Sequence, residues 1–487
     1  MTFVLGIDSS TTATKAVLVD GDGVVRAVGV AEYGYDTPHP GWSEQDPSLW
    51  WEATVAAIRQ VLDAVPDAEV VAVGLTGQMH GLVMLDAAGS VIRPAILWND
   101  QRTAVECDAL RAEIGPDRLV ELTGNDALTG FTAPKVAWVR THEPDHHAAI
   151  AAICLPKDYV RYRLTGDVAT DMADGSGTLL MDVAGRRWSD EMLHAVGLTP
   201  GQVPTLYEGP EVTGVVSATA AGSTGLAAGT PVVAGGGDQA ANAVGVGAVS
   251  PTVGAVSIGT SGVVFVPSDR PVVEPHGRVH AFCHAVPGRW HAMGVMLSAA
   301  GSLRWYRDTI APGVPFADLV AEAADVPPGA DGVRFLPYLT GERTPHADPD
   351  ATGAFVGLTV RHGRPHLTRA VLEGVAFGLG DGLRLMAEAG VPMPDEFRVS
   401  GGGARSPLWL QIVADVLGVE LATIESVEGA ALGAGLLAGV GAGWWSTVER
   451  AVETVEVVDR FRPGPEAEAL ADAHESFRAL YPALRGR

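Results

Sequence analysis

Short apolar runs, separated by polar or glycine residues, open the chain. Residues 3–8, FVLGID, precede the polar stretch 9–15, SSTTATK, and a second apolar run with Asp-Gly pairs within it covers residues 16–33. Runs of this length between turn residues are typical of β-strands, and an Asp-Gly pair favours a tight hairpin. The pattern therefore predicts a β-meander of three strands.

A related pattern returns in the second half of the chain. Residues 254–269, GAVSIGTSGVVFVPSD, contain two apolar runs that flank the turn 259–262, GTSG. Two hairpins with Ser, Thr and Gly turns are expected of a duplicated domain, although strand–turn–strand patterns also arise independently. We expect a domain boundary near residue 245, where glycines cluster, giving domains 1–245 and 246–487 with a cleft between them.

Strand and helix patterns alternate between and after these hairpins. Residues 70–86 indicate strand, turn and strand, whereas 48–65 and 408–418 have the spacing of apolar residues typical of amphipathic helices. This alternation predicts α/β layers. The apolar stretch 430–445 is short and rich in glycine, which favours a close-packed core helix over a membrane span.

Composition narrows the classes of partner. The net charge of −25 disfavours nucleic acid and anionic membranes as partners. The three cysteines, Cys107, Cys154 and Cys283, show no metal-binding spacing, so we expect reduced, buried thiols. The first ten residues lack the basic start of a signal peptide. A cytoplasmic protein is the resulting expectation.

Familiar nucleotide-binding and hydrolase motifs are absent from the sequence: it contains no GxxxxGK[ST], no suitably placed GxGxxG, no HExxH and no GxSxG. The turn after Asp8 suggests another mode of phosphate binding, since a carboxylate at a strand end can hold a hydrated Mg²⁺ beside hydroxyl and amide donors. The alternative is a turn whose polar side chains satisfy their own backbone.

Two further glycine turns could likewise bind a nucleotide or serve only as structural turns. The turn 259–262 would let a phosphate approach the backbone. Residues 400–418, SGGGARSPLWLQIVADVLG, place three glycines before a helix, where they could admit the base and ribose of a nucleotide. A tight strand-to-helix connection is the other interpretation of these glycines.

Asp238 stands after three glycines in residues 232–241, VVAGGGDQAA. The apolar run predicts a short strand, the glycines a turn, and the small residues that follow a helix. Asp238 could cap that helix, or it could accept a proton from a substrate hydroxyl. Capping does not require three preceding glycines, so we favour the base, with the glycines clearing space for the reacting groups.

Ordered motifs along nearly the whole chain resemble the FGGY family of carbohydrate kinases. Residues 130–142 and 353–373 are similar to its two signatures. The remaining motifs stand in family order: GQMHG (77–81), ILWNDQR (96–102), LPKDYVRYRLTG (155–166), GGGDQAA (235–241), SIGTSGV (257–263), FLPYLTGERTPH (335–346) and GGGARS (401–406).

This resemblance implies an α/β fold with two actin-like ATPase domains (ribonuclease H-like, as in hexokinase and Hsp70) around a catalytic cleft. The implied reaction is the phosphorylation of D-xylulose by ATP with Mg²⁺, and the implied partners are a ketopentose and ATP. A homodimer is left open. The implied site residues are Asp238 as general base; Met79, His80, Asn99, Asp100 and Gln239 at the sugar; Ser10, Thr11, Thr12, Gly259, Thr260, Ser261, Gly402, Gly403 and Ala404 at ATP; and Asp8 at the metal, through water.

Some alternatives stay open at this point. A kinase for ribulose, a hexulose or a polyol would need only small pocket changes, and a nucleotide-gated sugar-binding module would use the same fold without transfer. Asp100 could be a structural ion-pair partner, and Lys15 could pair with an acidic residue. Many relatives carry glycine where this chain has Ser10, so we expect an accommodating backbone angle there.

Overall fold

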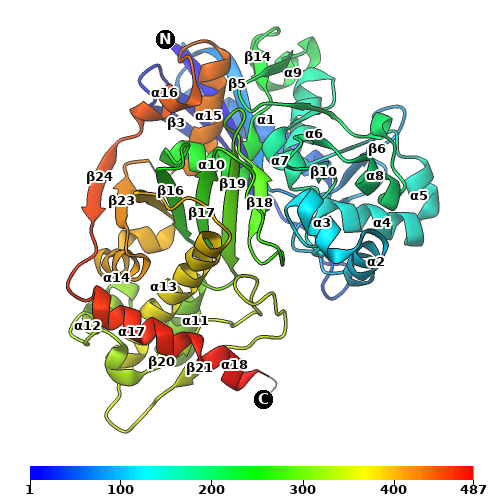
Figure 1. Ribbon diagram of the computed structural model, residues 1–487. Coiled ribbons are helices and arrows are strands. Elements are labelled where there is room, and N and C mark those ends of the chain that lie inside the picture. The colour runs from blue at the N-terminus through cyan, green and yellow to red at the C-terminus, as the bar shows by residue number, and fades with distance from the viewer. Residues whose placement is uncertain (427, 486–487) are drawn as a thin grey trace.

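Two seven-stranded sheets form the centre of the computed structural model, which describes residues 1–426 and 428–485 (Figure 1). The first sheet begins with the expected meander, in which neighbouring strands run antiparallel. Its strand order is β13 (Val212–Val215), β14 (Pro231–Val233), β5 (Glu69–Gly77), β1 (Thr2–Ser9), β2 (Ala13–Val19) and β3 (Val25–Glu32), with β15 (Gly236–Gly237) also paired to β5.

The second sheet contains the expected second hairpin, β16–β17. Its order is β18 (His280–Cys283), β19 (Trp290–Met296), β17 (Gly262–Ser268), β16 (Val253–Ile258), β22 (Glu396–Ser400), β23 (Glu420–Ile424) and β24 (Val457–Phe461). In both sheets the first strand of the hairpin pairs antiparallel with its successor and parallel with a later strand, β5 or β22. This shared pattern is what a duplicated domain predicts.

Strand β2 begins earlier than its apolar run. Thr14 belongs to the strand and is fully buried, and its hydroxyl lies 3.2 Å from the hydroxyl of Tyr33. A polar side chain can be buried when it has a hydrogen-bonding partner. The polar turn that the sequence predicted over residues 9–15 is therefore shorter in the structure.

Helix α1 (Pro47–Ala64) packs across β2 and β3, as its amphipathic pattern predicts. A group of helices follows and lies beside the first sheet, coloured cyan to green in Figure 1. It comprises α2 (Ala104–Ile114), α3 (Pro116–Thr123), α4 (Thr132–His142), α5 (Pro144–Ala148), α6 (Pro156–Thr165), α7 (Met172–Ser176) and α8 (Asp190–Val196), and α9 (Ala218–Thr224) packs on α1 and α6.

The second sheet is covered by the long helix α13 (Arg364–Glu388), most of which is buried. Around it lie α11 (Ala300–Ile310), α12 (Phe316–Ala323), α14 (Pro407–Leu417), α17 (Ala467–Arg478) and α18 (Leu480–Leu484). Short strand pairs complete the fold: β4 (Glu44–Gln45) with β7 (Ala95–Ile96), β6 (Val83–Leu85) with β8 (Ala152–Cys154), β9 (Ala169–Asp171) with β12 (Thr205–Tyr207), β10 (Met181–Asp182) with β11 (Arg187–Trp188), and β20 (Arg334–Leu336) with β21 (Ala354–Val356).

Helix α15 (Gly429–Gly441) is the close-packed helix that the stretch 430–445 predicts, and it returns to the first sheet (Figure 1). It crosses α10 (Asp238–Val246) so closely that a Cβ on Gly433 would lie 1.8 Å from the carbonyl oxygen of Ala241. A segment from the second half of the chain thus completes the first sheet's cover, followed by α16 (Val448–Ala451). The boundary at residue 245 stays a prediction.

The structure also bears on the cysteines and on the possibility of a membrane span. Cys107, Cys154 and Cys283 are all free and buried. Within residues 1–426 and 428–485, none of the helices is both long enough and apolar enough to cross a membrane.

Candidate active site

A cavity of about 200 Å³ lies where elements of the two sheets face each other. Its first wall comes from the ends of β5 and β7, the segment before α4 and the start of α10. Its second wall comes from β17, β19 and the loop after β20. The lining residues are Met79, His80, Trp98, Leu128, Gly130, Phe131, Asp238 and Gln239 on the first side, and Ser261, Val263, Met293, Val295 and Arg343 on the second.

Asp238 is the first residue of α10, and Gly237 is the N-cap. Asp238 is thus not the N-cap residue of α10, which is the position that the sequence left open for it. Asp238 also lines the cavity. A carboxyl group that lines a cavity can accept a proton from a hydroxyl bound there.

The glycines before Asp238 allow close packing, whereas their expected role of clearing space for the reacting groups stays a prediction. A Cβ on Gly235, whose φ is +82°, would lie 1.8 Å from the carbonyl oxygen of Leu75. A Cβ on Gly237 would lie 2.9 Å from the Cγ of Met79. Protein atoms therefore occupy the space beside both glycines, which allow β14, β15 and α10 to approach β5.

Two carboxyl groups at the strand ends have raised pKa values. Burial raises the pKa of Asp238 to about 7, and the negative charge of Asp8 adds to the shift. Burial also raises the pKa of Asp8 to about 6, although Lys15 opposes the shift. A carboxyl group with a pKa near 7 can both accept and release a proton at neutral pH.

Asp8 fits the metal role predicted for it in one respect. Its Oδ1 atom is buried and has no hydrogen-bonding partner among the described residues, and a buried carboxylate oxygen normally has one. A hydrated Mg²⁺ would supply that partner. Lys15 pairs instead with Glu428 at 2.5 Å, the acidic partner that the sequence left open.

His80 lines the cavity and has an unusual backbone conformation, with φ at +68°. Non-glycine residues in this region often mark functional sites. Its Nδ1 lies 2.5 Å from the carbonyl oxygen of Gly177. Because a carbonyl oxygen only accepts, Nδ1 carries the proton. Burial lowers the pKa of His80 to about 3, so the ring is neutral and Nε2 is an acceptor.

The other residues predicted at the sugar divide into two groups. Met79 and Gln239 line the same cavity as His80 and Asp238. Asp100 is fully buried and accepts hydrogen bonds from Arg102 at both carboxylate oxygens and from the Ser43 amide. That is the structural ion pair that the sequence left open.

Asn99 precedes this ion pair and does not line the cavity. Its Oδ1 atom is buried and has no partner within the described part of the chain. Contact of Asn99 and Asp100 with a sugar stays a prediction.

The first predicted phosphate turn contacts a residue of the cavity wall, Trp98. The indole of Trp98 donates a hydrogen bond to the hydroxyl of Thr11 at 3.0 Å. Ser10 donates its hydroxyl to the carbonyl of Ala13, whereas Thr12 is exposed. We expected Ser10 to adopt a backbone angle of the kind that glycine reaches easily. That prediction is wrong, because Ser10 is not among the residues with positive φ. Internal hydrogen bonds hold this turn without glycine.

The two later glycine turns pack against each other. In the turn Gly259–Gly262, both Thr260 and Ser261 are exposed. A Cβ on Gly403 would lie 2.4 Å from the Cγ2 of Ile258, which precedes this turn. Gly402 is exposed with open space around its Cα, and Ala404 follows it, partly buried. Predicted phosphate and adenosine contacts thus lie on one surface, although packing alone explains Gly403.

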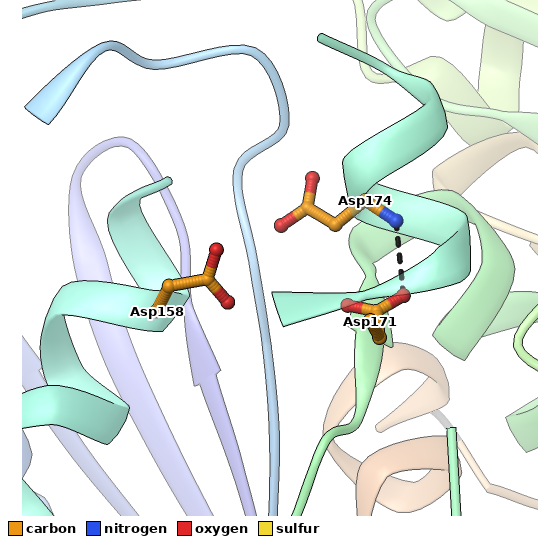
Figure 2. A group of neighbouring side chains, drawn as sticks. All are labelled: Asp158, Asp171 and Asp174. Atoms are coloured by element: carbon orange, nitrogen blue, oxygen red, sulfur yellow. Dashed lines mark hydrogen bonds between the residues drawn. The ribbon is translucent and has the colours of Figure 1, made fainter. Parts of the chain in front are cut away.

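A group of buried carboxylates outside the cavity has the spacing of a metal site. Asp158, Asp171 and Asp174 place ligand oxygens within 4.8 Å of one another, and the Asp174 amide donates to Asp171 (Figure 2). The ammonium of Lys157 lies 2.5 Å from Asp158 and 2.7 Å from Asp171. Lys157 therefore supplies the positive charge that a metal ion would bring.

Several cavity residues were not predicted from the sequence, namely Trp98, Leu128, Gly130, Phe131, Val263, Met293, Val295 and Arg343. Five of them lie within the quoted motifs 96–102, 130–142, 257–263 and 335–346, which was the only available signal: Trp98, Gly130, Phe131, Val263 and Arg343. Leu128, Met293 and Val295 lie outside these motifs, and an apolar residue by itself does not distinguish a cavity wall from the core.

Comparisons with known proteins agree with these motifs. The model of the FGGY family of carbohydrate kinases, N-terminal domain, matches residues 3–245, and that of the C-terminal domain matches residues 254–442. A xylulose kinase of Escherichia coli strain K12 is 45% identical over 483 residues, 99% of each chain. One from Bacillus subtilis is 38% identical over 93% of this chain and 91% of its own. The crystal structure of a xyloylose kinase from Brucella ovis matches with a TM-score of 0.94 and 41% identity, over 99% of both chains.

Proposed function

The chain belongs to the FGGY family of carbohydrate kinases, and on that premise we propose that it transfers the γ-phosphoryl group of ATP to the terminal hydroxyl of D-xylulose. One observation carries the choice of site. A single cavity brings together Met79, His80, Gln239 and a carboxyl group, that of Asp238, whose pKa is about 7. The near full-length similarity to xylulose kinases supports the choice of sugar.

Asp238 acts as the general base in this proposal. The terminal hydroxyl oxygen attacks the γ-phosphorus as its proton passes to Asp238. The bond from the γ-phosphorus to the bridging oxygen breaks, and ADP leaves with that electron pair. Because the transition state is loose, positioning and charge neutralisation supply most of the catalysis, and a general base typically adds about 10²–10⁴-fold.

The sugar lies against the first wall of the cavity. The neutral ring of His80, with Nδ1 bonded to Gly177, offers Nε2 as an acceptor for a sugar hydroxyl. Gln239, next to the base, contributes an amide that can donate and accept. Met79 supplies an apolar contact for the carbon chain.

ATP is the phosphoryl donor, and its phosphates would approach the exposed turn with Thr260 and Ser261. The hydroxyl-bearing turn Ser10–Thr12 would face the phosphates from the first sheet, and Gly402, Gly403 and Ala404 would contact the adenosine. Asp8 would hold Mg²⁺ through water, and the ion would neutralise phosphate charge. A cytoplasmic location and a homodimer belong to the same set of proposals.

The experiment is a panel of sugars assayed by ADP release with Mg-ATP: D-xylulose, D-ribulose, a hexulose, xylitol and glycerol. We expect the highest kcat/KM for D-xylulose and loss of turnover when Mg²⁺ is chelated. A higher kcat/KM for another ketose or for a polyol would show that D-xylulose is not the preferred substrate. ATP binding without transfer to any sugar would favour the nucleotide-gated binding module.

A further inference from the structure

Arg343 places an unpaired positive charge in the cavity. Its guanidinium has neither an ion pair nor a hydrogen bond with any part of the chain that the structure describes, and the side chain is partly buried. Nearby Arg278 and Arg384, by contrast, are paired with Glu274 and Glu388. A guanidinium carries five N–H donors in a planar fork, so Arg343 is equipped to bind oxygen atoms of a ligand.

Backbone hydrogen bonds fix the loop that carries Arg343. Thr344 donates its amide to the carbonyl of Val295 at 3.0 Å, and its hydroxyl accepts from the Val295 amide at 3.2 Å. The neighbouring Glu342 accepts from the amides of Leu297 and Arg343 with one carboxylate oxygen. The loop is therefore attached to β19, a wall of the cavity, before any ligand binds.

Arg343 and His80 line the same cavity. The charge of Arg343 contributes to the lowered pKa values of His80 and His280. The charge that acts on Asp238 is instead that of Asp8. The same cavity is thus lined by the base, Asp238, by a donor, Arg343, and by an acceptor, Nε2 of His80.

We infer that Arg343 binds the carbonyl oxygen of a ketose while His80 accepts a hydrogen bond from the hydroxyl next to that carbonyl, and that this pair selects ketoses over polyols. The inference rests on the proposed function. The reacting hydroxyl at the far end of an open-chain pentulose then reaches Asp238. The open-chain form is required, because ring closure would consume both the carbonyl and that hydroxyl.

The selectivity follows from the counting of donors and acceptors. A carbonyl oxygen only accepts, which matches a guanidinium that only donates. In a polyol the same oxygen keeps a proton, which needs an acceptor of its own. Since Nε2 of His80 is already occupied by the neighbouring hydroxyl, that proton would be buried without a partner, at a cost.

The test compares D-xylulose with xylitol, which differs from it by reduction of the carbonyl. For Arg343→Met we expect kcat/KM and affinity for D-xylulose to fall about 10–100-fold, the range for a hydrogen bond to a charged group. Xylitol binding, measured by calorimetry, should change less than about threefold, and the KM for ATP should not change. Arg343→Lys, which keeps the charge, should recover part of the loss.

Matched controls separate this role from a structural one. Arg384→Met removes an arginine of α13 that is paired with Glu388 and should leave the sugar preference unchanged. An equal loss for D-xylulose and xylitol in Arg343→Met would overturn the inference, as would an effect confined to ATP. If the wild-type enzyme preferred gluconate, Arg343 would bind the carboxylate of that substrate, and the inference about the ketose carbonyl would be overturned. Failure of the proposed function is a separate outcome, namely no ketose turnover by the wild-type enzyme.

Discussion

The carboxyl group of Asp238 combines exposure to the cavity with a pKa of about 7. For Asp238→Asn we expect phosphorylation of the sugar to fall about 10²–10⁴-fold, because the amide cannot accept the proton. In the wild-type enzyme, kcat/KM should fall about tenfold per pH unit below pH 7, where Asp238 is protonated. Steady-state kinetics measure the loss of turnover and its pH dependence, and ATP titration shows whether the variant still binds ATP. Lost ATP affinity, or near-normal turnover, would contradict the base role.

The same group makes a prediction about stability. Its folded-state pKa is raised above the ordinary value of 3.8, so its contribution to stability is complete below pH 4 and is lost as pH rises through 7. Asn has no such charge to bury. Urea unfolding should show Asp238→Asn gaining stability relative to the wild type between pH 4 and pH 7, by at most about 1.4 kcal/mol per pH unit. A constant difference across this range would show that the pKa is not raised.

At the scale of elements, the crossing of α10 and α15 determines where Asp238 stands. A Cβ on Gly433 would lie 1.8 Å from the carbonyl oxygen of Ala241, so Gly433→Ala must separate the helices. We expect a loss of about 1–3 kcal/mol in unfolding free energy, together with lower turnover because α10 carries the base. Gly222→Ala is the control, since Gly222 in α9 is exposed with open space. Equal effects of the two variants would contradict the packing account.

At the scale of the whole molecule, the base and the exposed Thr260–Ser261 turn belong to opposite walls of the cavity. Sugar and ATP together should therefore draw the walls closer and exclude water. X-ray scattering should show a smaller radius of gyration with D-xylulose and a non-hydrolysable ATP analogue than with either alone. The Asp238→Asn variant should show the same decrease in radius of gyration, because it still binds both ligands. An unchanged radius with both ligands would mean that closure is not part of the reaction.

Several features could be predicted from the sequence because they depend on neighbouring residues. Apolar runs with turn residues between them located the two hairpins, and glycine-rich apolar spacing identified α15 as a core helix. Asp238 was located as the first residue after a strand and turn. Local hydrogen bonding and periodicity carry this information, so a single sequence contains it.

The remaining features were decided by tertiary structure. The glycines before Asp238 contact β5, Ser10 needs no special backbone angle, and Asp100 is held by Arg102. Arg343 reaches the cavity only because the loop after β20 bonds to β19. Each of these depends on segments far apart in the chain. The sequence by itself determined which residues could do chemistry, whereas long-range packing decided which of them share a cavity and with which charges.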